Sequence, residues 1–234
     1  MLDLVLPPRC AGCSRALTER RALCTACDRA LARIDRSACP ACQDAAPAPG
    51  MRCEACASGS GVLDACCAAV WFEGAAASYV RRFKYAGPRL AGFDPGAEAV
   101  ALALVREAAA LVPGPLPDAL VPVPLHAARV RARGFTPSAV LARSLARALG
   151  APPLGALLRV RDTPSQTWLD RPGRRRNVAG AFAPARAVPG CTVWLVDDVV
   201  TTGATLGEAA RVLREAGARR VAAVCVARTP APPG

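Results

Sequence analysis

The sequence predicts an α/β protein in which a mostly parallel sheet, covered by helices on both faces, is preceded by a small cysteine-rich module. The first observation is that short apolar runs alternate with helical segments through the second half and more of the chain, a pattern typical of parallel sheets. The second is that ten of the twelve cysteines lie before residue 68, and eight of them form four Cys-x-x-Cys pairs. We therefore expect two domains, residues 1–60 and residues 61–234, joined by the Gly/Ser-rich stretch ASGSGVL at 57–63.

The four cysteine pairs predict two zinc ribbons in tandem. Ten residues separate the two pairs of each ribbon, and the second ribbon repeats the spacing of the first 29 residues later. Two facing knuckles can offer four thiolates to Zn²⁺ at tetrahedral positions, and so short a segment cannot fold on apolar burial alone. Disulfides are the alternative, which a reducing compartment disfavours. Consecutive pairs are favoured over interleaved pairs, although the spacing leaves both open. The expected ligands of two structural zinc ions are Cys10, Cys13, Cys24, Cys27, Cys39, Cys42, Cys53 and Cys56.

Strand and helix signals follow one another after the cysteine-rich part. Asp94-Pro95 has the form of a helix start, because an N-cap residue precedes a proline at the first helical position. Leu141, Leu145 and Leu149 fall on one face of a later helix. Ligands of parallel sheets bind at the carboxyl ends of the strands, so the loops after the strands are the places to search. We expect strands at 67–72, 119–123, 192–196 and 221–226, and helices at 74–85, from 94 to before Pro113, 138–149 and 205–216.

Two adjacent carboxylates, Asp197 and Asp198, come at the expected end of a buried strand. Two like charges there are costly unless a cation or hydroxyl donors meet them. The run that follows enters a helix, where backbone N–H groups and the helix dipole favour a phosphate, and its glycine permits the tight turn. Acids and a phosphate cradle so close together suit a sugar phosphate, with the acids on the ribose hydroxyls and the loop on the 5′-phosphate. The loop consists of Thr201, Thr202, Gly203, Ala204 and Thr205.

This run of four apolar residues, Asp-Asp, two apolar residues and Thr-Thr-Gly-Ala-Thr resembles the phosphoribosyl diphosphate (PRPP) signature of type I phosphoribosyltransferases. The resemblance implies that Asp197 and Asp198 hold the ribose hydroxyls and Mg²⁺, and that Thr201 to Thr205 hold the 5′-phosphate. It also implies a pentosyl transfer in which pyrophosphate leaves C1 of ribose as a nitrogen nucleophile attacks. The glycine-rich motifs of P-loop and dinucleotide-binding proteins are absent from the sequence.

Two arginine-rich segments are candidates for contacts with the pyrophosphate. The stretch from Val121 to Phe135 offers Arg129, Arg131 and Arg133 in what reads as a loop after a strand. The stretch 159–182 is rich in arginine, proline and glycine, and it is expected to form a mobile flap that closes over the substrate. A solvated basic face is the alternative for both. His126, the only histidine, is expected to serve loop structure.

The chain as a whole resembles the ComF family of competence-associated, phosphoribosyltransferase-like proteins. The resemblance rests on the cysteine pairs and on short motifs that include Lys84-Tyr85-x-Gly87, Arg133-Gly134-Phe135, Arg161-x-Thr163-x-x-Gln166 and Asn177-x-x-Gly180-Ala181-Phe182. One departure is Gly-Phe-Thr-Pro at 134–137, where the family usually has Gly-Phe-Asn-Gln. PRPP contacts are implied for Lys84, Arg129, Arg133 and Arg161.

The charge and the N-terminus bear on partners and location. The formal net charge is +12 and comes almost wholly from arginine, which suits phosphate and nucleic-acid partners unless it reflects a general bias toward arginine. The N-terminus has no basic or long apolar segment, and no stretch is apolar enough to cross a membrane, so a cytoplasmic protein is expected.

Three functions are compatible with these patterns. The leading one is a ComF-like phosphoribosyltransferase that binds PRPP with Mg²⁺ and acts in DNA uptake or handling, with single- or double-stranded DNA and other uptake proteins as partners. The second is a nucleic-acid-binding adaptor whose transferase fold is idle or senses PRPP. The third is a phosphoribosyltransferase of nucleotide salvage. The acceptor is not specified by any stretch of the sequence.

Overall fold

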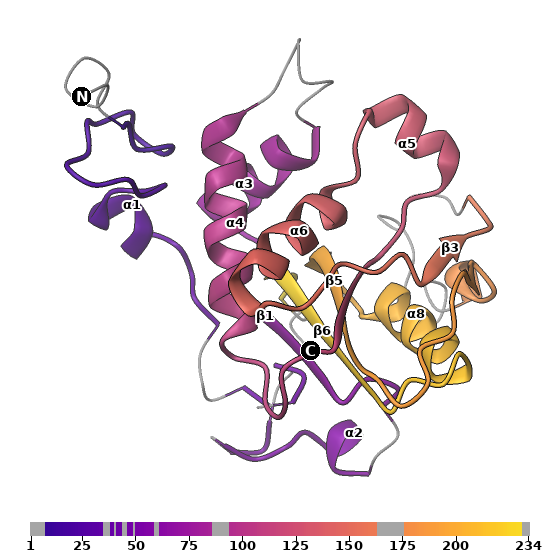
Figure 1. The fold of residues 1–234 in the computed structure, drawn as a ribbon. Helices are drawn as coiled ribbons and strands as arrows, with labels where there is room; N and C mark the ends of the chain where they lie inside the picture. Colours follow the sequence, from indigo (N-terminus) through magenta and orange to yellow (C-terminus); the bar gives the residue numbers. More distant parts are fainter. Residues whose placement is uncertain are drawn as a thin grey trace.

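A central sheet with helices on both faces forms the body of the protein, and the two cysteine-rich segments lie at different places on its periphery (Figure 1). The structure is a computed structural model. It describes residues 8–34, 38–39, 41–43, 46–48, 50–58, 61–85, 94–162 and 176–230.

The main sheet has four parallel strands in the order β1-β6-β5-β2. Its two central strands are almost continuous apolar runs, as expected where a parallel sheet is covered on both faces. A separate antiparallel pair is formed by β3 and β4. The strands are β1 (Ala65–Trp71), β2 (Ala119–Pro122), β3 (Leu157–Arg159), β4 (Phe182–Pro184), β5 (Thr192–Val200) and β6 (Arg220–Arg228).

Helices cover the sheet in two groups. One face is covered by α4 and α6, with α3 packed on α4, and the other face is covered by α8 together with the β3–β4 pair. Each face has its own apolar core, with Trp194 on the α4–α6 side and Leu195 on the α8 side. The helices are α1 (Thr25–Arg29), α2 (Glu54–Ala57), α3 (Gly74–Tyr85), α4 (Pro95–Ala109), α5 (Ala127–Arg133), α6 (Pro137–Leu149) and α8 (Ala204–Glu215).

The first cysteine-rich segment packs on α3 and α4 as part of the core. Leu17, Leu23 and Leu31 are buried in the same apolar cluster as residues of these helices. Arg33 continues the joint at the surface, where its guanidinium bonds Glu107 of α4 (Nε to Oε1, 2.7 Å) and Asp28 of α1 (Nη2 to Oδ1, 2.9 Å). The first segment is thus fixed to the body by apolar burial as well as by ion pairs.

The second cysteine-rich segment and the chain before it cover the outer edge of β1. Ile34 N–H donates to Ala69 O at 3.2 Å, and Cys66 N–H donates to Ala41 O at 2.6 Å. Between them the Gln43 side chain acts as a strand substitute, because its Oε1 accepts from Ala68 N–H and its Nε2 donates to Ala68 O at 2.8 Å. The backbone groups of β1 are therefore paired at both edges.

Replacing Gln43 by leucine is expected to lower stability without loss of zinc. Gln43 is buried, and leucine has a similar size but leaves the N–H and C=O of Ala68 without partners, at roughly 1–3 kcal/mol each. The melting temperature of the zinc-loaded protein should fall by roughly 5–10 °C. An unchanged melting temperature for Gln43→Leu would contradict this role.

Three features differ from the sequence expectations. Residues 127–133, expected as a loop, form the helix α5, whose alanine and arginine residues favour a helix. Strand β5 continues through both aspartates to Val200, because β6 is long enough to pair with it there. The ends of the expected flap form the unforeseen β3–β4 pair, which brings residues 157–159 beside 182–184. Most of the flap, including Thr163 and Gln166, and Gly87 lie outside the described residues.

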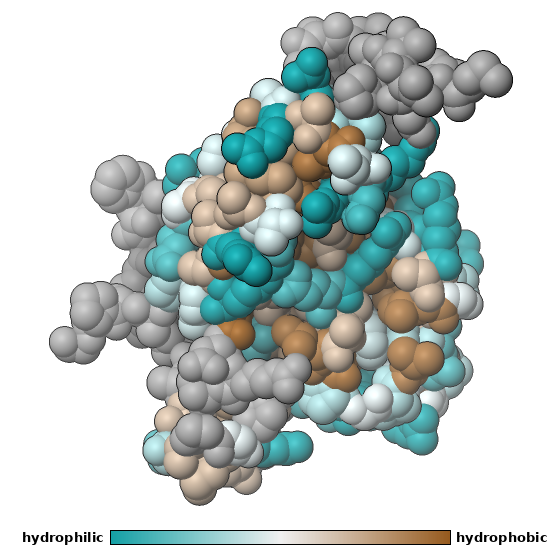
Figure 2. All heavy atoms as spheres, turned by 90° about the vertical axis from the view of Figure 1, so that its left-hand side faces the viewer, coloured by the Kyte–Doolittle hydropathy of each residue, from teal (hydrophilic) through white to brown (hydrophobic). Residues whose placement is uncertain are grey.

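Seen from the side that carries the first cysteine-rich segment, the surface is mixed (Figure 2). Among the coloured atoms, hydrophobic residues form separate islands divided by hydrophilic ones. In the parts of the chain that the structure describes, none of the helices combines the length and apolar character needed to span a membrane.

Candidate functional site

The carboxyl end of β5 holds the two acidic residues that the sequence singles out. Asp197 is paired in register with Cys225 of β6, so both acids lie within the sheet rather than beyond it. Lys84, from the last turn of α3, reaches Asp198 with its Nζ 3.0 Å from Oδ1. Each acid also accepts a hydrogen bond from the backbone N–H of the next residue. Asp198 N–H donates to Asp197 Oδ1 at 2.9 Å, and Val199 N–H donates to Asp198 Oδ1 at 2.7 Å.

The negative charge of the two acids is only partly compensated by the positive groups around them. Burial, together with the negative charge of Asp198, raises the pKa of Asp197 to about 7, although Lys84 and Arg159 act in the opposite direction. Burial lowers the pKa of Lys84, but the charges of the two aspartates outweigh it, so the pKa of Lys84 lies above its ordinary value. One lysine thus does not fully compensate two carboxylates, and an additional positive charge would stabilise them.

The loop after β5 leads straight into the start of α8. Gly203 is the N-cap residue and has a φ of +75°, a conformation that favours glycine. Thr202 Oγ1 lies 3.4 Å from Ala204 N, and Gly207 N–H donates to Gly203 O at 2.7 Å. The first N–H groups of a helix point away from its body, so this loop can offer them, with the hydroxyls of Thr201, Thr202 and Thr205, to an anion.

Arg129, Arg159 and Asp162 form a group of charged side chains between α5 and the end of β3. Arg129 Nε donates to Asp162 Oδ1 at 3.0 Å, and His126 Nδ1 lies 4.0 Å from Asp162 Oδ2. Arg159 stacks on Phe182 and is close enough for the charge of Asp197 to affect its pKa, which burial lowers below the ordinary value. The sequence places Arg159 and Asp162 within the expected flap at 159–182 but gives neither residue a role of its own. The signal that could have found them is the basic run after Leu157, if it is interpreted as the end of a strand.

The other two arginines that the sequence predicts for the site, Arg133 and Arg161, make contacts with other residues. The guanidinium of Arg133 lies over the ring of Tyr85, 5.2 Å from its centroid. Arg161 Nη1 donates to Ala179 O, and this bond joins the two ends of the segment that the β3–β4 pair also brings together. Among the residues that the structure describes, neither Arg133 nor Arg161 forms a hydrogen bond or ion pair with Asp197 or Asp198.

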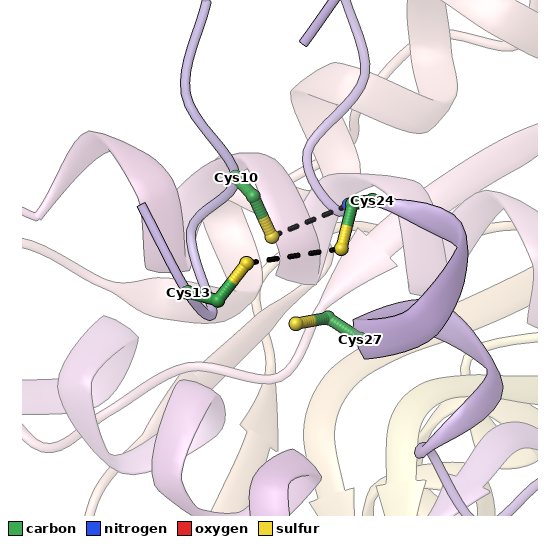
Figure 3. Close-up of side chains that lie close together, drawn as sticks. All are labelled: Cys10, Cys13, Cys24 and Cys27. Carbon is green, nitrogen blue, oxygen red and sulfur yellow. Dashed lines mark hydrogen bonds between the residues drawn. The ribbon is translucent and has the colours of Figure 1, made fainter. Parts of the chain in front are cut away.

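The eight paired cysteines form two clusters made of consecutive pairs. In each cluster the four sulfur atoms lie within 4.8 Å of one another. Figure 3 shows the first cluster, in which Cys10, Cys13, Cys24 and Cys27 point toward a common centre. The Sγ atoms of Cys13 and Cys24 are 3.8 Å apart, and those of Cys42 and Cys53 are 3.5 Å apart. Zn–S bonds of ~2.3 Å in a tetrahedron place sulfur atoms ~3.8 Å apart, so both clusters fit zinc.

The electrostatics of the clusters also fit a bound cation. Burial raises the pKa of Cys10, but backbone N–H groups, among them those of Cys24 and Gly12 at 3.2 Å and 3.4 Å, lower it to about 6. The neighbouring sulfur atoms, that of Cys24 above all, raise the pKa of Cys27 to about 12. Four thiolates therefore cannot coexist near neutral pH without a cation between them.

Two family models match the chain. A double zinc ribbon domain matches residues 1–70, and a phosphoribosyl transferase domain matches residues 133–234. With the two four-cysteine clusters and the four-stranded parallel sheet, these matches confirm the fold class and the two zinc-binding sites expected from the sequence.

Curated proteins of similar sequence include DNA utilization protein YhgH of Escherichia coli O157:H7. It is 31% identical over 228 residues, which cover 97% of this chain and 99% of that protein. YhgH of Salmonella typhi is 43% identical over 116 residues, 49% of this chain, and the match spans 51% of its length. Competence protein F of Haemophilus influenzae is 39% identical over 110 residues, covering 45% of this chain and 48% of that protein.

A search of solved structures finds the allosteric regulatory enzyme of purine biosynthesis, with a TM-score of 0.42 and 22% identity over 63% of this chain and 30% of that one. The likeness to the E. coli protein, in contrast, runs the length of both chains. The chain therefore belongs to the family that contains DNA utilization protein YhgH and competence protein F. This agrees with the resemblance to the ComF family that the sequence motifs indicate.

Proposed function

We propose that the protein binds PRPP with Mg²⁺ at the end of β5 and transfers its phosphoribosyl group, as a member of the phosphoribosyltransferases. The observation that carries the proposal is the meeting of Asp197, Asp198 and Lys84 with the Gly203 loop at the carboxyl end of one strand. Acids on one side and helix N–H groups on the other match the hydroxyls and the 5′-phosphate of a single pentose. The phosphoribosyl transferase family model covers this part of the chain and supports the same ligand class.

Each group has a task that follows from its chemistry. Asp197 and Asp198 accept hydrogen bonds from the ribose hydroxyls, while Thr201 to Thr205 hold the 5′-phosphate. Arg159, whose pKa is affected by the charge of Asp197, and Arg129 are the proposed contacts of the pyrophosphate. Lys84 already lies beside Asp198 and can orient it. In the transfer, the bond between C1 and the pyrophosphate oxygen breaks, pyrophosphate leaves with the electron pair, and a nitrogen nucleophile bonds to C1.

The carboxylate pair fits Mg²⁺, which takes oxygen ligands from one or two carboxylates and substrate phosphates. The raised pKa of Asp197 is the observation that supports this, since a cation beside it relieves the repulsion between the acids. When bound, Mg²⁺ supplies charge stabilisation for the departing pyrophosphate.

The cellular role belongs to the proposal as well. We place the protein in the handling or uptake of DNA, because a relative that spans its sequence is named for DNA utilization and a relative that matches 45% of it is named for competence. A cytoplasmic location is also part of the proposal, because the thiols of a zinc ribbon must be reduced to bind the metal. Single- or double-stranded DNA and other uptake proteins are the expected partners.

The test is a thermal shift with PRPP and Mg²⁺. At a concentration 100 times the dissociation constant, binding adds ~2.7 kcal/mol of stability, so the melting temperature should rise by roughly 5–10 °C. The double variant Asp197→Asn, Asp198→Asn should show no rise, whereas Asp118→Asn, at the opposite end of the sheet beside Thr192, should keep it. A wild-type protein that PRPP does not stabilise would overturn the proposal.

A second candidate, a DNA-binding adaptor without turnover, is favoured by the arginines of α5, of which Arg131 is exposed. The two are separated by pyrophosphate release. Release that depends on DNA supports a transferase acting in DNA handling, release that depends on a free base supports nucleotide salvage, and DNA binding without any release supports the adaptor.

Replacing Gly203 by valine is expected to weaken PRPP binding more than folding. A cavity of about 440 Å³ separates the loop from the second zinc ribbon, and an added Cβ would meet no atom within 4 Å. The cost to stability therefore comes only from the positive φ and should be ~1–2 kcal/mol, or a few degrees in melting temperature. Rearrangement of the loop should weaken the PRPP affinity at least tenfold.

The matched control is Gly207→Ala, because Gly207 also lines the cavity but lies inside α8 with open space around it. Its PRPP affinity should stay close to that of the wild type. Equal losses of affinity and stability in Gly203→Val would instead mark a purely structural glycine.

A further inference from the structure

The last three residues of α3 point in three different directions. Phe83 is buried and packs edge-on against Phe135, with 6.2 Å between ring centroids. Lys84 turns to the acids and meets Asp198. Tyr85 turns to solvent, and 72% of its surface is exposed. An exposed aromatic ring is thus held one residue away from a side chain of the candidate PRPP site.

A second element fixes this ring. Arg133, the last residue of α5, lies with its guanidinium 5.2 Å from the centroid of the Tyr85 ring. Figure 1 shows that α3 and α5 both rise above the end of β5 where the strand carries the acids. The contacts between Phe83 and Phe135 and between Tyr85 and Arg133 keep the ends of these two helices together. We call the pair Tyr85 and Arg133 the Tyr85 shelf.

We infer that the Tyr85 shelf binds a nucleobase carried on a single-stranded nucleic acid, at the mouth of the candidate PRPP site. A base of any kind can stack on an exposed aromatic ring, and an arginine beside the ring adds a cation–π contribution. The arginines of α5 supply positive charge for the strand's phosphates. This inference rests on the proposed role in DNA handling and adds to it the group of the DNA that is recognised.

The exposure of Tyr85 decides between a strand and a free base. Small ligands bind in enclosed pockets that cover 70–90% or more of their surface. A ring that is 72% exposed offers one stacking face and little enclosure, so most of the binding must come from elsewhere. A strand provides this through its phosphates, whereas a free base has no such contacts.

The experiment compares two 12-nucleotide strands on the full-length, zinc-loaded protein by fluorescence anisotropy. One strand is oligothymidylate, and the other has the same backbone with abasic residues. The wild type should prefer oligothymidylate about tenfold, since a stacked base contributes ~1–3 kcal/mol. Tyr85→Ala should lose this preference while keeping the affinity for the abasic strand, and Tyr85→Phe should retain the preference.

Two further variants separate stacking from charge and from general exposure. Leu116→Ala removes another exposed apolar side chain, 64% exposed and near the opposite end of the sheet, and should leave the preference unchanged. Arg131→Gln should weaken both strands alike and reduce the dependence of affinity on salt. A preference for oligothymidylate that persists in Tyr85→Ala would contradict base binding by the Tyr85 shelf. So would a wild type that binds the two strands with equal affinity, or one that binds neither strand. If micromolar free thymine or adenine displaced the strand, the occupant of the Tyr85 shelf would be a free base. This result would contradict the inference that the base is carried on a nucleic-acid strand.

The same proteins distinguish this inference from the proposed function. Tyr85→Ala should keep the thermal shift with PRPP and Mg²⁺, because Asp197, Asp198 and the Gly203 loop are intact. If PRPP fails to shift the wild type while the base preference is present, the proposed function fails and the shelf stands. If PRPP shifts the wild type and the preference is absent, the shelf fails and the proposed function stands.

Discussion

Replacing Cys24 by serine is expected to reduce bound zinc from about two ions per chain to about one and to lower the melting temperature by roughly 10–20 °C. A ribbon without its metal does not keep its fold. Leu17, Leu23 and Leu31 would then leave the core that they share with α3 and α4, at ~1.5–3 kcal/mol for each side chain. Zinc content by metal analysis and unfolding by circular dichroism measure the two effects.

Cys191→Ser is the matched control. Cys191 is only partly buried and belongs to neither four-cysteine cluster, so this variant should keep both zinc ions and nearly all of its stability. Cys53→Ser tests the other ribbon and should also lose one zinc ion. Two zinc ions retained in Cys24→Ser would contradict the tetrahedral assignment of the first cluster.

Replacing Asp197 by asparagine is expected to stabilise the protein without ligand while it weakens PRPP binding. The pKa of Asp197 in the folded protein is about 7, above the value of 3.8 for a free aspartate. The folded state therefore binds more protons than the unfolded state between these values, and the free energy of unfolding falls as the pH rises through this range. Asparagine cannot ionise, so the variant should be more stable than the wild type by roughly 2–4 kcal/mol at pH 8.

The pH dependence gives this prediction its check. Between pH 6 and pH 8 the stability difference between Asp197→Asn and the wild type should grow by ~1 kcal/mol, measured by denaturant unfolding. Both proteins keep their zinc ligands, so any effect of pH on the ribbons cancels in the difference. Asp118→Asn should show no such growth. A variant that is less stable than the wild type at pH 8 would mean that Asp197 contributes to the fold as a charged group.

The order of the four strands of the main sheet and of α3, α4, α6 and α8 could be predicted because each of these elements carries its own local signal. Asp94 caps α4 as expected, with its Oδ1 accepting from Ala97 N–H at 2.9 Å, and α3 has the expected bounds. The two four-cysteine clusters followed from spacing, since ligands close in sequence must meet at one ion. These features depend on residues near one another in the chain.

Features that depend on distant residues could not be predicted in this way. The pairing of β3 with β4 and the contact between Arg129 and Asp162 join segments whose proximity no local pattern encodes. Gln43 has the sequence context of a loop residue, and its role is evident only from the hydrogen bonds of its amide with Ala68 in the adjoining strand β1. The roles of Asp197, Asp198 and the Gly203 loop stay predictions that the experiments above address. The division at residues 60 and 61 also stays a prediction.

The pairing of Ala41, Gln43 and Ile34 with β1 limits how this protein can be divided for study. A fragment that starts at residue 61 would leave the outer side of β1 with a row of exposed amide and carbonyl groups, which invites pairing with another chain and aggregation. A fragment of residues 61–234 is therefore expected to be insoluble, which would prevent measurement of its activity. Recombinant production should keep the zinc-binding part attached.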